Sequence, residues 1–305
     1  MNTNELIAVT VTYYPEPHLL RAQLEALPRD CLKIVVDNAS AETARQSIRK
    51  LRESIPHVHC VENSENIGLA AALNQGVRLG KELRPNALCC LLLDQDSELQ
   101  GDCVAELWKS MNALTQQGER VGCVGPLLVD AKTGLTHGFH QMTRWCWRRV
   151  YPALGDDAPV RCSNINGSGT FMPIDLFLQL KGLDESLFID HVDTEWSFRL
   201  QAHGYTLWGI PKATFLHRMG ETSLRFWLLG WRGWPDRSPQ RHRYLFRNAV
   251  WLMRRPYIPN VWKFWAVVKL TLTMVVHGAF DSRRSIQLKN MLLGLKQGMS
   301  ESGND

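Results

Sequence analysis

The chain has 305 residues, of which 45% are hydrophobic and 21% charged, as in a globular protein with one large domain, or one domain and an appendage. Its eight cysteines form no Cys-x-x-Cys or Cys-x-x-His pair, which excludes a disulfide framework and a zinc site and indicates a reducing compartment. The net charge of +5 is uneven, because residues 221–305 hold 14 Lys and Arg against 5 Asp and Glu and so carry +9, whereas the first 220 residues carry −4.

The first residues lack the basic and apolar segments of a signal peptide, so we expect a cytoplasmic protein. Strand and helix patterns then alternate. Strands are predicted at 6–13, 32–36, 58–62, 87–93 and 121–129, with helices at 16–27, 42–54, 69–83 and 104–115. This alternation predicts an α/β fold, in which helices flank a mostly parallel sheet.

Polar side chains follow three of these strands. Thr12 and Tyr13 end the first strand, Asp37 ends the second, and Asp94 and Asp96 follow a run of three leucines. Ligands of open α/β sheets bind beyond the carboxyl ends of the strands, so these groups are expected to share one crevice. The two carboxylates suit Mg²⁺ or Mn²⁺ bound to phosphates, although acidic residues are also common at plain strand-to-helix turns.

Two glycine-containing loops lie between and after these strands. Gly68 follows Asn66 and opens a helix of small residues, whose N-terminus is a preformed anion site. Gly169 lies among small polar residues at 163–172, where a ligand could approach the backbone. Taken alone, each is also the pattern of an ordinary turn or surface loop.

A second group of acidic residues precedes and opens a helix predicted from Val192 onward. Asp193 and Glu195 lie near its N-terminus, where the helix dipole stabilises anions. A carboxylate here could act as a general base toward a hydroxyl, or these acids could simply cap the helix and pair with Arg199. His217, after a short apolar run, is either a metal or phosphate ligand or a structural histidine.

These blocks together resemble the family 2 glycosyltransferases, which have the GT-A fold. The matching segments, in the family's order, are Val11-Thr12-Tyr13, Val36-Asp37-Asn38-Ala39-Ser40, Asn66-x-Gly68-x-Ala70-x-x-x-Asn74-x-Gly76, Asp94-x-Asp96, Asp193-x-Glu195-x-x-x-Arg199 and His217. They span about residues 6–220, and the expected catalytic domain covers residues 1–220. Within the family, the chain is similar to bacterial L-rhamnosyltransferases of O-antigen and cell-surface polysaccharide assembly, except that Tyr14 replaces the usual Asn.

The resemblance implies roles for the residues at the strand ends. Asp37 would accept a hydrogen bond from the imide N–H of uracil or thymine, with Thr12 and Tyr13 lining the base. Asp94 and Asp96 would hold the ribose of a nucleotide sugar and the Mg²⁺ or Mn²⁺ bound to its diphosphate.

It also implies roles for the second half of the site. His217 would complete the metal or diphosphate contacts. Asp193 would deprotonate the acceptor hydroxyl for in-line attack, which inverts the anomeric carbon. The remaining residues expected to contribute to substrate binding are Asn66, Gly68, Asn74, Gly169, Glu195 and Arg199.

Residues 221–305 form a basic region with six of the eleven tryptophans. Lys263 and Lys269 interrupt an apolar helix at 261–277, so its uninterrupted length is too short to span a membrane. Lys269, Thr273 and His277 recur every four residues as a polar stripe. These features predict a helix in the membrane interface, with basic residues drawn to anionic lipid. The alternative is a helix packed on the body or on a second subunit.

The leading interpretation is therefore an inverting, metal-dependent transferase that moves L-rhamnose from dTDP-L-rhamnose to a lipid-linked saccharide at the inner membrane face. A UDP-hexose donor is the first alternative. A nucleotidyltransferase is disfavoured because Tyr13-Tyr14-Pro15 stands where a glycine-rich basic loop is expected. A membrane-tethered scaffold would bind nucleotide without turnover. No motif supports nucleic-acid binding, and the acceptor and the oligomeric state are left open.

Overall fold

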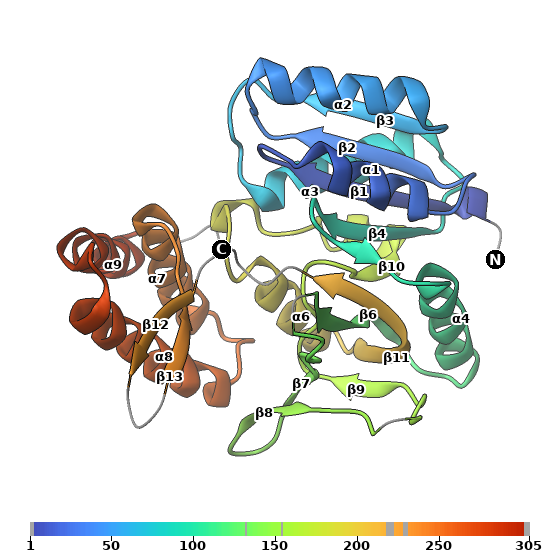
Figure 1. Ribbon diagram of the computed structural model, residues 1–305. Coiled ribbons are helices and arrows are strands. Elements are labelled where there is room, and N and C mark those ends of the chain that lie inside the picture. Colours follow the sequence, from blue (N-terminus) through green and yellow to red (C-terminus); the bar gives the residue numbers. More distant parts are fainter. Residues whose placement is uncertain (1–2, 132, 154, 218–222, 228–230, 302–305) are drawn as a thin grey trace.

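The computed structural model describes residues 3–131, 133–153, 155–217, 223–227 and 231–301. Its centre is a nine-stranded mixed sheet with the order β3-β2-β1-β4-β10-β6-β11-β5, and β9 pairs with β11 (Figure 1). The predicted α/β fold with a mostly parallel sheet in its first half is confirmed.

The first half of the sheet is parallel. It consists of β1 (Leu6–Thr12), β2 (Leu32–Asp37), β3 (Val58–Glu62) and β4 (Cys89–Asp94). Apolar side chains fill both faces of β1, as is typical of a parallel strand covered on both sides. The register pairs Thr12 with Asp37 and Val11 with Asp94, so these strands end at one level.

Helices cover both faces of the sheet. One face packs against α1 (Pro17–Ala26), α2 (Glu42–Ser54) and α4 (Cys103–Gln116), and the other against α3 (Leu69–Leu83), α5 (Ile174–Gln179) and α6 (Val192–Ala202). The bounds of α2, β3 and α3 are those predicted. The other elements predicted in the first 130 residues are present, with ends shifted by one or two residues.

The second half of the sheet contains antiparallel strands that the sequence did not predict. Short β10 (Phe171–Pro173) runs antiparallel between β4 and β6 (Val121–Asp130). β11 (Thr206–His217) is parallel to β6 and antiparallel to β5 (Glu98–Leu99) and β9 (Val160–Cys162). A separate hairpin joins β7 (Phe139–Met142) to β8 (Trp147–Val150). All eight cysteines are free thiols, as expected.

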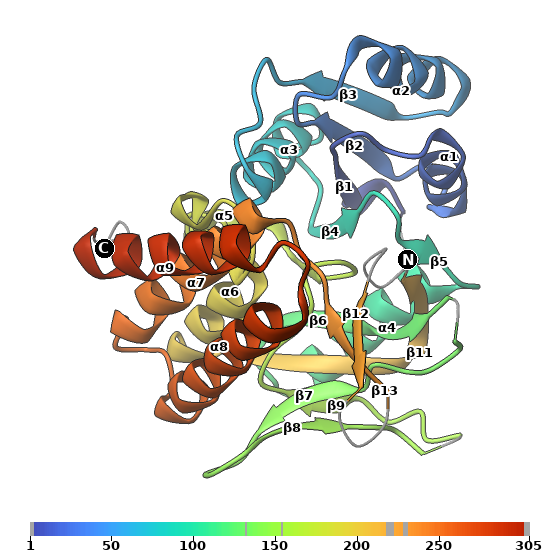
Figure 2. The same ribbon diagram turned by 60° about the vertical axis from the view of Figure 1, so that its left-hand side comes forward.

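The C-terminal region contains the hairpin of β12 (Ser223–Trp227) and β13 (Trp231–Pro235), followed by α7 (Pro239–Arg254), α8 (Asn260–Phe280) and α9 (Arg284–Ser300). The three helices form a group beside the sheet, with α6 between them and β6 (Figures 1 and 2). Trp251, Leu252 and Trp262 belong to the same apolar core as α3 and α6, so this region is packed on the body.

Only the first residue of the polar stripe predicted on α8 faces water. Thr273 and His277 are buried against the protein, while Lys269 is exposed. Apolar side chains such as Phe264 and Val275 lie on the outside, 63% and 59% exposed. Within the described ranges, α8 is also the one helix whose 21 residues are long and apolar enough to cross a membrane, which corrects the expectation that it is too short. Core helices of soluble proteins can be equally long and apolar.

Candidate active site at the strand ends

Thr12 and Asp37 meet where β1 and β2 end. The Thr12 hydroxyl donates to Asp37 Oδ1 over 3.1 Å, and the Ser40 backbone N–H and Arg45 Nε donate to Oδ2 over 3.0 and 3.2 Å. The Asp37 side chain is fully buried. Asp37 therefore ties the two strand ends together, and its carboxylate is enclosed by protein donors.

Tyr13 and Tyr14 extend this edge into solvent. Their rings are 49% and 55% exposed and touch edge to face, with centroids 4.7 Å apart. The Tyr13 N–H donates to Gln95 Oε1 over 2.7 Å, and the Tyr14 N–H donates to Ser40 Oγ over 2.7 Å. Tyr14 has a left-handed φ of 52°, which bends the chain away from β1. The exposed face of one of these two perpendicular rings is a surface on which a nucleobase could stack.

Asp94 is the last residue of β4, and Asp96 lies in the turn that follows. The Asp94 N–H donates to Ser168 Oγ over 3.2 Å, and Gln23 Nε2 donates to the Asp94 carbonyl over 2.6 Å. Asp96 is half-buried and makes no hydrogen bond or ion pair with the described residues. An unpaired carboxylate close to a second one, at the carboxyl end of a central strand, provides the hard oxygen ligands that Mg²⁺ and Mn²⁺ prefer. The residues present therefore fit a divalent cation.

His217 is the last residue of β11, where it pairs with Asp130 in the strand register. Its side chain lies outside the described part of the chain, so its predicted role as a ligand stays a prediction. A different set, Asp236, His277 and Asp281, is close enough to hold a metal ion. That set lies in the C-terminal region, and Arg283 already forms ion pairs with both of its carboxylates. Asp94 and Asp96 remain the better candidates.

Asn66 and Gly68 form the turn that leads into α3. Asn66 Oδ1 accepts from Asn38 Nδ2 over 2.9 Å and from the Gly68 N–H over 3.0 Å. Gly68 has a φ of 89°, and a Cβ added there would lie 2.6 Å from the Phe188 ring. The first N–H of α3, that of Leu69, donates to the Phe188 carbonyl over 2.6 Å. This helix N-terminus is therefore covered by the segment around Phe188.

Asn74 and Gly169 are packed inside the protein. Asn74 is 1% exposed and exchanges two hydrogen bonds with the Leu183 backbone, each of 2.8 Å. Gly169 has a φ of 83°, and a Cβ there would collide with the Pro126 ring. Its N–H donates to the Leu92 carbonyl over 2.8 Å. These contacts are structural. Asn74 joins the loop at Leu183 to α3, and Gly169 joins its own loop to β4.

Asp193 lies in the first turn of α6 and is half-buried. Its carboxylate accepts from the Thr194 N–H over 2.8 Å, and the Gly167 backbone N–H lies close to it. Burial and the neighbouring Asp190 raise the pKa of Asp193, although these two N–H groups oppose the rise. The next residue after Gly167 is Ser168, which contacts Asp94. The loop at 166–169 therefore connects the proposed base to the turn after β4.

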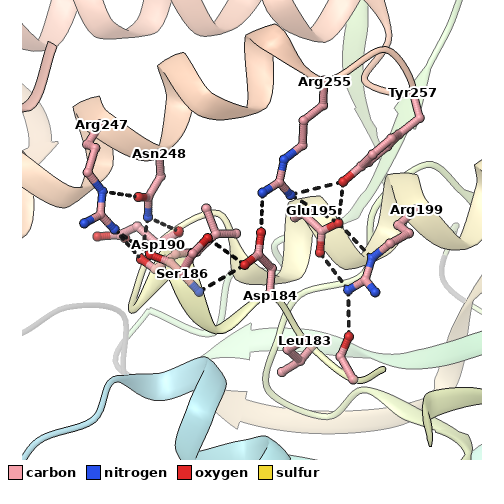
Figure 3. A network of polar contacts seen from close by, with 12 residues as sticks. Leu183, Asp184, Ser186, Asp190, Glu195, Arg199, Arg247, Asn248, Arg255 and Tyr257 are labelled. Carbon is pink, nitrogen blue, oxygen red and sulfur yellow. Dashed lines mark hydrogen bonds and ion pairs between the residues drawn. The ribbon is translucent and has the colours of Figure 1, made fainter. Parts of the chain in front are cut away.

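Glu195 and Arg199 form a buried ion pair instead of facing this loop. Arg199 Nε and Nη2 donate to Glu195 over 2.8 and 2.9 Å, and the guanidinium also donates to the Leu180 and Gly182 carbonyls. Tyr257 donates to the same carboxylate over 2.6 Å. Figure 3 shows this network between α6 and the end of α7, with every Glu195 oxygen occupied. The contacts of Glu195 and Arg199 are therefore structural.

Several arginines of the C-terminal region, expected to attract lipid, instead bind the segment before α6. Arg255 pairs with Asp184, and Arg247 donates to the Ser186 and Leu187 carbonyls. Arg241 pairs with Asp190. The sequence offered one signal for this arrangement, which is the excess of acids before α6 over what helix capping requires. It could not indicate which helix would supply the partners.

Comparison with known proteins identifies the family. The family model described as Glycosyl transferase family 2 matches residues 9–156, and that described as Glycosyl transferase family group 2 matches residues 90–292, two thirds of the chain. The chain is a family 2 glycosyltransferase. A relative named dTDP-rhamnosyl transferase RfbF, from Shigella flexneri, is 29% identical over 260 residues, which cover 85% of this chain and 83% of the relative.

Solved structures share the fold of this glycosyltransferase. GalNAc-T7 with UDP, GalNAc and Mn²⁺ has a TM-score of 0.58 at 18% identity, covering 97% of this chain and 55% of that chain. The mannosyltransferase PcManGT from Pyrobaculum calidifontis, with GDP-Man and Mn²⁺, has a TM-score of 0.55 at 16% identity, covering 98% and 76%. The glycosyltransferase thus spans about half the length of GalNAc-T7. Both neighbours hold Mn²⁺.

Proposed function

We propose that this glycosyltransferase transfers L-rhamnose from dTDP-L-rhamnose to a hydroxyl group of a lipid-linked saccharide, with inversion at the anomeric carbon. The observation that carries the proposal is the link between the two acidic positions. Ser168 accepts from the Asp94 N–H, and the adjacent Gly167 lies beside Asp193, whose Cβ would be 3.9 Å from a Cβ added at Gly167. The carboxylates that we assign to the metal-diphosphate site and to the general base would therefore lie on either side of one short loop.

In the proposed reaction, Asp193 takes the proton of the acceptor hydroxyl. The acceptor oxygen forms a bond to the anomeric carbon as the bond from that carbon to the diphosphate oxygen breaks, and the nucleoside diphosphate leaves with the electron pair. A carboxylate whose pKa is raised by burial is a stronger base than an exposed aspartate. A single displacement of this kind needs no carboxylate nucleophile.

Asp94 and Asp96 would hold the divalent cation, which neutralises the charge that develops on the leaving diphosphate. One of the two perpendicular rings, Tyr13 or Tyr14, would stack against the base, and the other would border it. Asp37 is enclosed by its own donors, so we assign it to shaping the base pocket through Thr12 and Arg45. The thymidine donor is supported by the relative named dTDP-rhamnosyl transferase.

The lipid-linked acceptor is supported by the outer surface of the C-terminal helices. α9 carries a shallow groove lined by Leu288, Leu292 and Leu293 and flanked by Lys289 and Lys296. Apolar side chains between lysines are typical of helices that bind at a membrane interface. Together with the exposed face of α8, this surface would hold the enzyme on the inner side of the cell membrane, beside its acceptor.

Calorimetry of nucleotide binding tests the site. We expect dTDP to bind more tightly than GDP in the presence of Mn²⁺, and Asp96→Ala to remove the gain in affinity that Mn²⁺ provides. Asp193→Asn should bind dTDP as the unaltered protein does, because the base lies on the acceptor side of the loop. Tighter binding of GDP than of dTDP would overturn the proposed donor.

A further inference from the structure

We propose that Arg241, assisted by Arg237, is a positioning residue for the reaction and acts on Asp193 through Asp190. The proposal rests on the function proposed above, in which Asp193 is the base. It assigns part of the C-terminal region to the acid–base chemistry, whereas the sequence indicated only an attachment surface.

Asp190 is the residue that both arginines contact. Arg241 donates from Nε to Asp190 Oδ2 over 3.1 Å and from Nη2 to Oδ1 over 3.3 Å. Arg237 Nε lies 3.8 Å from the same carboxylate. The Asp190 side chain is only 8% exposed, so its charge is poorly screened by water. Without the arginines, this negative charge three residues before Asp193 would lose both of its ion pairs with the described residues.

The backbone around Asp190 is fixed from α7. Phe188, Asp190 and His191 have left-handed φ values of 64°, 62° and 64°. Non-glycine residues adopt this conformation at a cost, so it persists where surrounding contacts impose it. Asn248 is buried and donates to the carbonyls of Leu187, Ile189 and Asp190 over 2.7, 2.8 and 3.0 Å. Figure 3 shows Arg247 and Asn248 pointing from α7 to this segment.

Charge then links this segment to the base. Asp190 raises the pKa of Asp193, since a nearby negative charge disfavours ionisation. Burial alone would lower the pKa of Arg241, but the negative charges of Asp190 and Asp94 raise it. Arg241 therefore lies within electrostatic range of the segment before α6 and of the end of β4. The charged and titratable groups that act on Asp193, directly or through a neighbour, are Asp190, Lys269, Arg237, Arg241, His191 and Arg149.

Lys269 and His191 also lie close to Asp193, and they differ in charge near pH 7. Lys269 of α8 lies within electrostatic range of both Asp190 and Asp193 and favours their ionised forms. Burial lowers the pKa of His191 to about 4, so this side chain is neutral near pH 7. Arg241 and Arg237 are the residues that form ion pairs with Asp190. Their removal should therefore make Asp193 harder to ionise.

The direct test is a carbon-13 NMR titration of protein labelled at the aspartate carboxyl groups, in which the Asp193 signal is assigned by its loss in Asp193→Asn. We expect Arg241→Gln to raise the pKa of Asp193 by about half a pH unit, and Asp190→Asn to lower it by about as much. The double variant should return close to the starting value. Arg243→Gln is the matched control, because Arg243 is also exposed on α7 but contacts Gln297.

A merely structural role for Arg241 would change stability without moving this titration. An unchanged Asp193 titration in Arg241→Gln, or equal effects of Arg241→Gln and Arg243→Gln, would overturn the proposal. The pH dependence of dTDP release from dTDP-L-rhamnose in the presence of Mn²⁺ is the second readout, and its acidic limb should move with the NMR titration. If the NMR titration moves and the rate profile does not, the role of Asp193 as base is wrong, while the coupling of Arg241 to Asp193 stands.

Discussion

Asp193 and Glu195 are two residues apart in the chain, and the structure gives their carboxylates different surroundings. Asp193 accepts from the Thr194 N–H and lies beside Gly167, in the loop that contacts Asp94. Glu195 points to the other side of α6, where Arg199 and Tyr257 occupy its oxygens. Helical spacing separates two such positions by about 200°, so the sequence could place both acids on one helix but could not decide which one faces the site.

Replacement of the proposed base should separate chemistry from binding. Asp193→Asn should lower the rate of transfer by about 10²- to 10⁴-fold, the usual contribution of a general base, with dTDP affinity retained. In the unaltered enzyme the rate should fall as the pH decreases through the pKa of Asp193, because the protonated acid cannot accept a proton. Since that pKa is raised, the fall should occur above the range of an ordinary aspartate, about 3.9. Normal turnover by Asp193→Asn would refute this assignment.

Replacement of Glu195 should instead affect stability. Glu195→Ala leaves Arg199 buried without its carboxylate, and breaking a buried pair in this way costs about 3–5 kcal/mol. Urea unfolding should show this loss. Glu25→Ala removes the exposed pair with Arg21 and should cost less than about 1 kcal/mol. Equal unfolding midpoints for the two variants would show that the Glu195 network contributes little.

At the scale of elements, the sequence predicted the strands and helices of the first half because each has a buried run or an amphipathic face of ordinary length. It missed β10, since three residues ending at Pro173 are too short to show a period. It also missed the strength of the contact between α7 and the segment before α6. Arg247 and Asn248 are polar residues on a helix, and their sequence pattern does not tell that they are buried.

Gly68 and Gly118 form a matched pair for testing the turn that leads into α3. Their φ values are 89° and 90°, but a Cβ at Gly118 meets nothing within 4 Å, whereas one at Gly68 meets Phe188. Gly118→Ala should therefore cost about 1 kcal/mol from backbone strain alone. Gly68→Ala should cost clearly more in urea unfolding and should also weaken transfer, because Phe188 must move. Equal costs would contradict the close packing described for this turn.

At the scale of the whole molecule, the C-terminal region has two faces with different roles. One face joins the core through Trp251 and Trp262 and holds the segment that precedes Asp193. The other exposes apolar side chains of α8 and α9. Composition and charge predicted a basic region with an exposed apolar surface. They could not reveal the inner face, because packing depends on a tertiary arrangement that a single helix pattern does not encode.

This division makes point variants better probes of membrane binding than truncation, which would remove core residues. Phe264→Ser with Val275→Ser should reduce flotation with anionic vesicles severalfold, and added salt should weaken the binding that remains. Leu83→Ser, at an exposed apolar position on α3, should leave flotation unchanged. If the full-length protein does not bind anionic vesicles at low salt, this result would instead favour packing of the exposed face against a second subunit.

The central claim is that the strand-end acids and Asp193 form the site of an inverting, metal-dependent rhamnosyl transfer. The most direct measurement is nucleoside diphosphate release from a panel of dTDP-L-rhamnose, UDP-hexoses and GDP-mannose, with Mn²⁺ and with excess EDTA, for the unaltered protein and for Asp193→Asn. We predict release from dTDP-L-rhamnose that requires the metal and Asp193. Turnover of another donor in preference, or full activity in EDTA, would contradict the account.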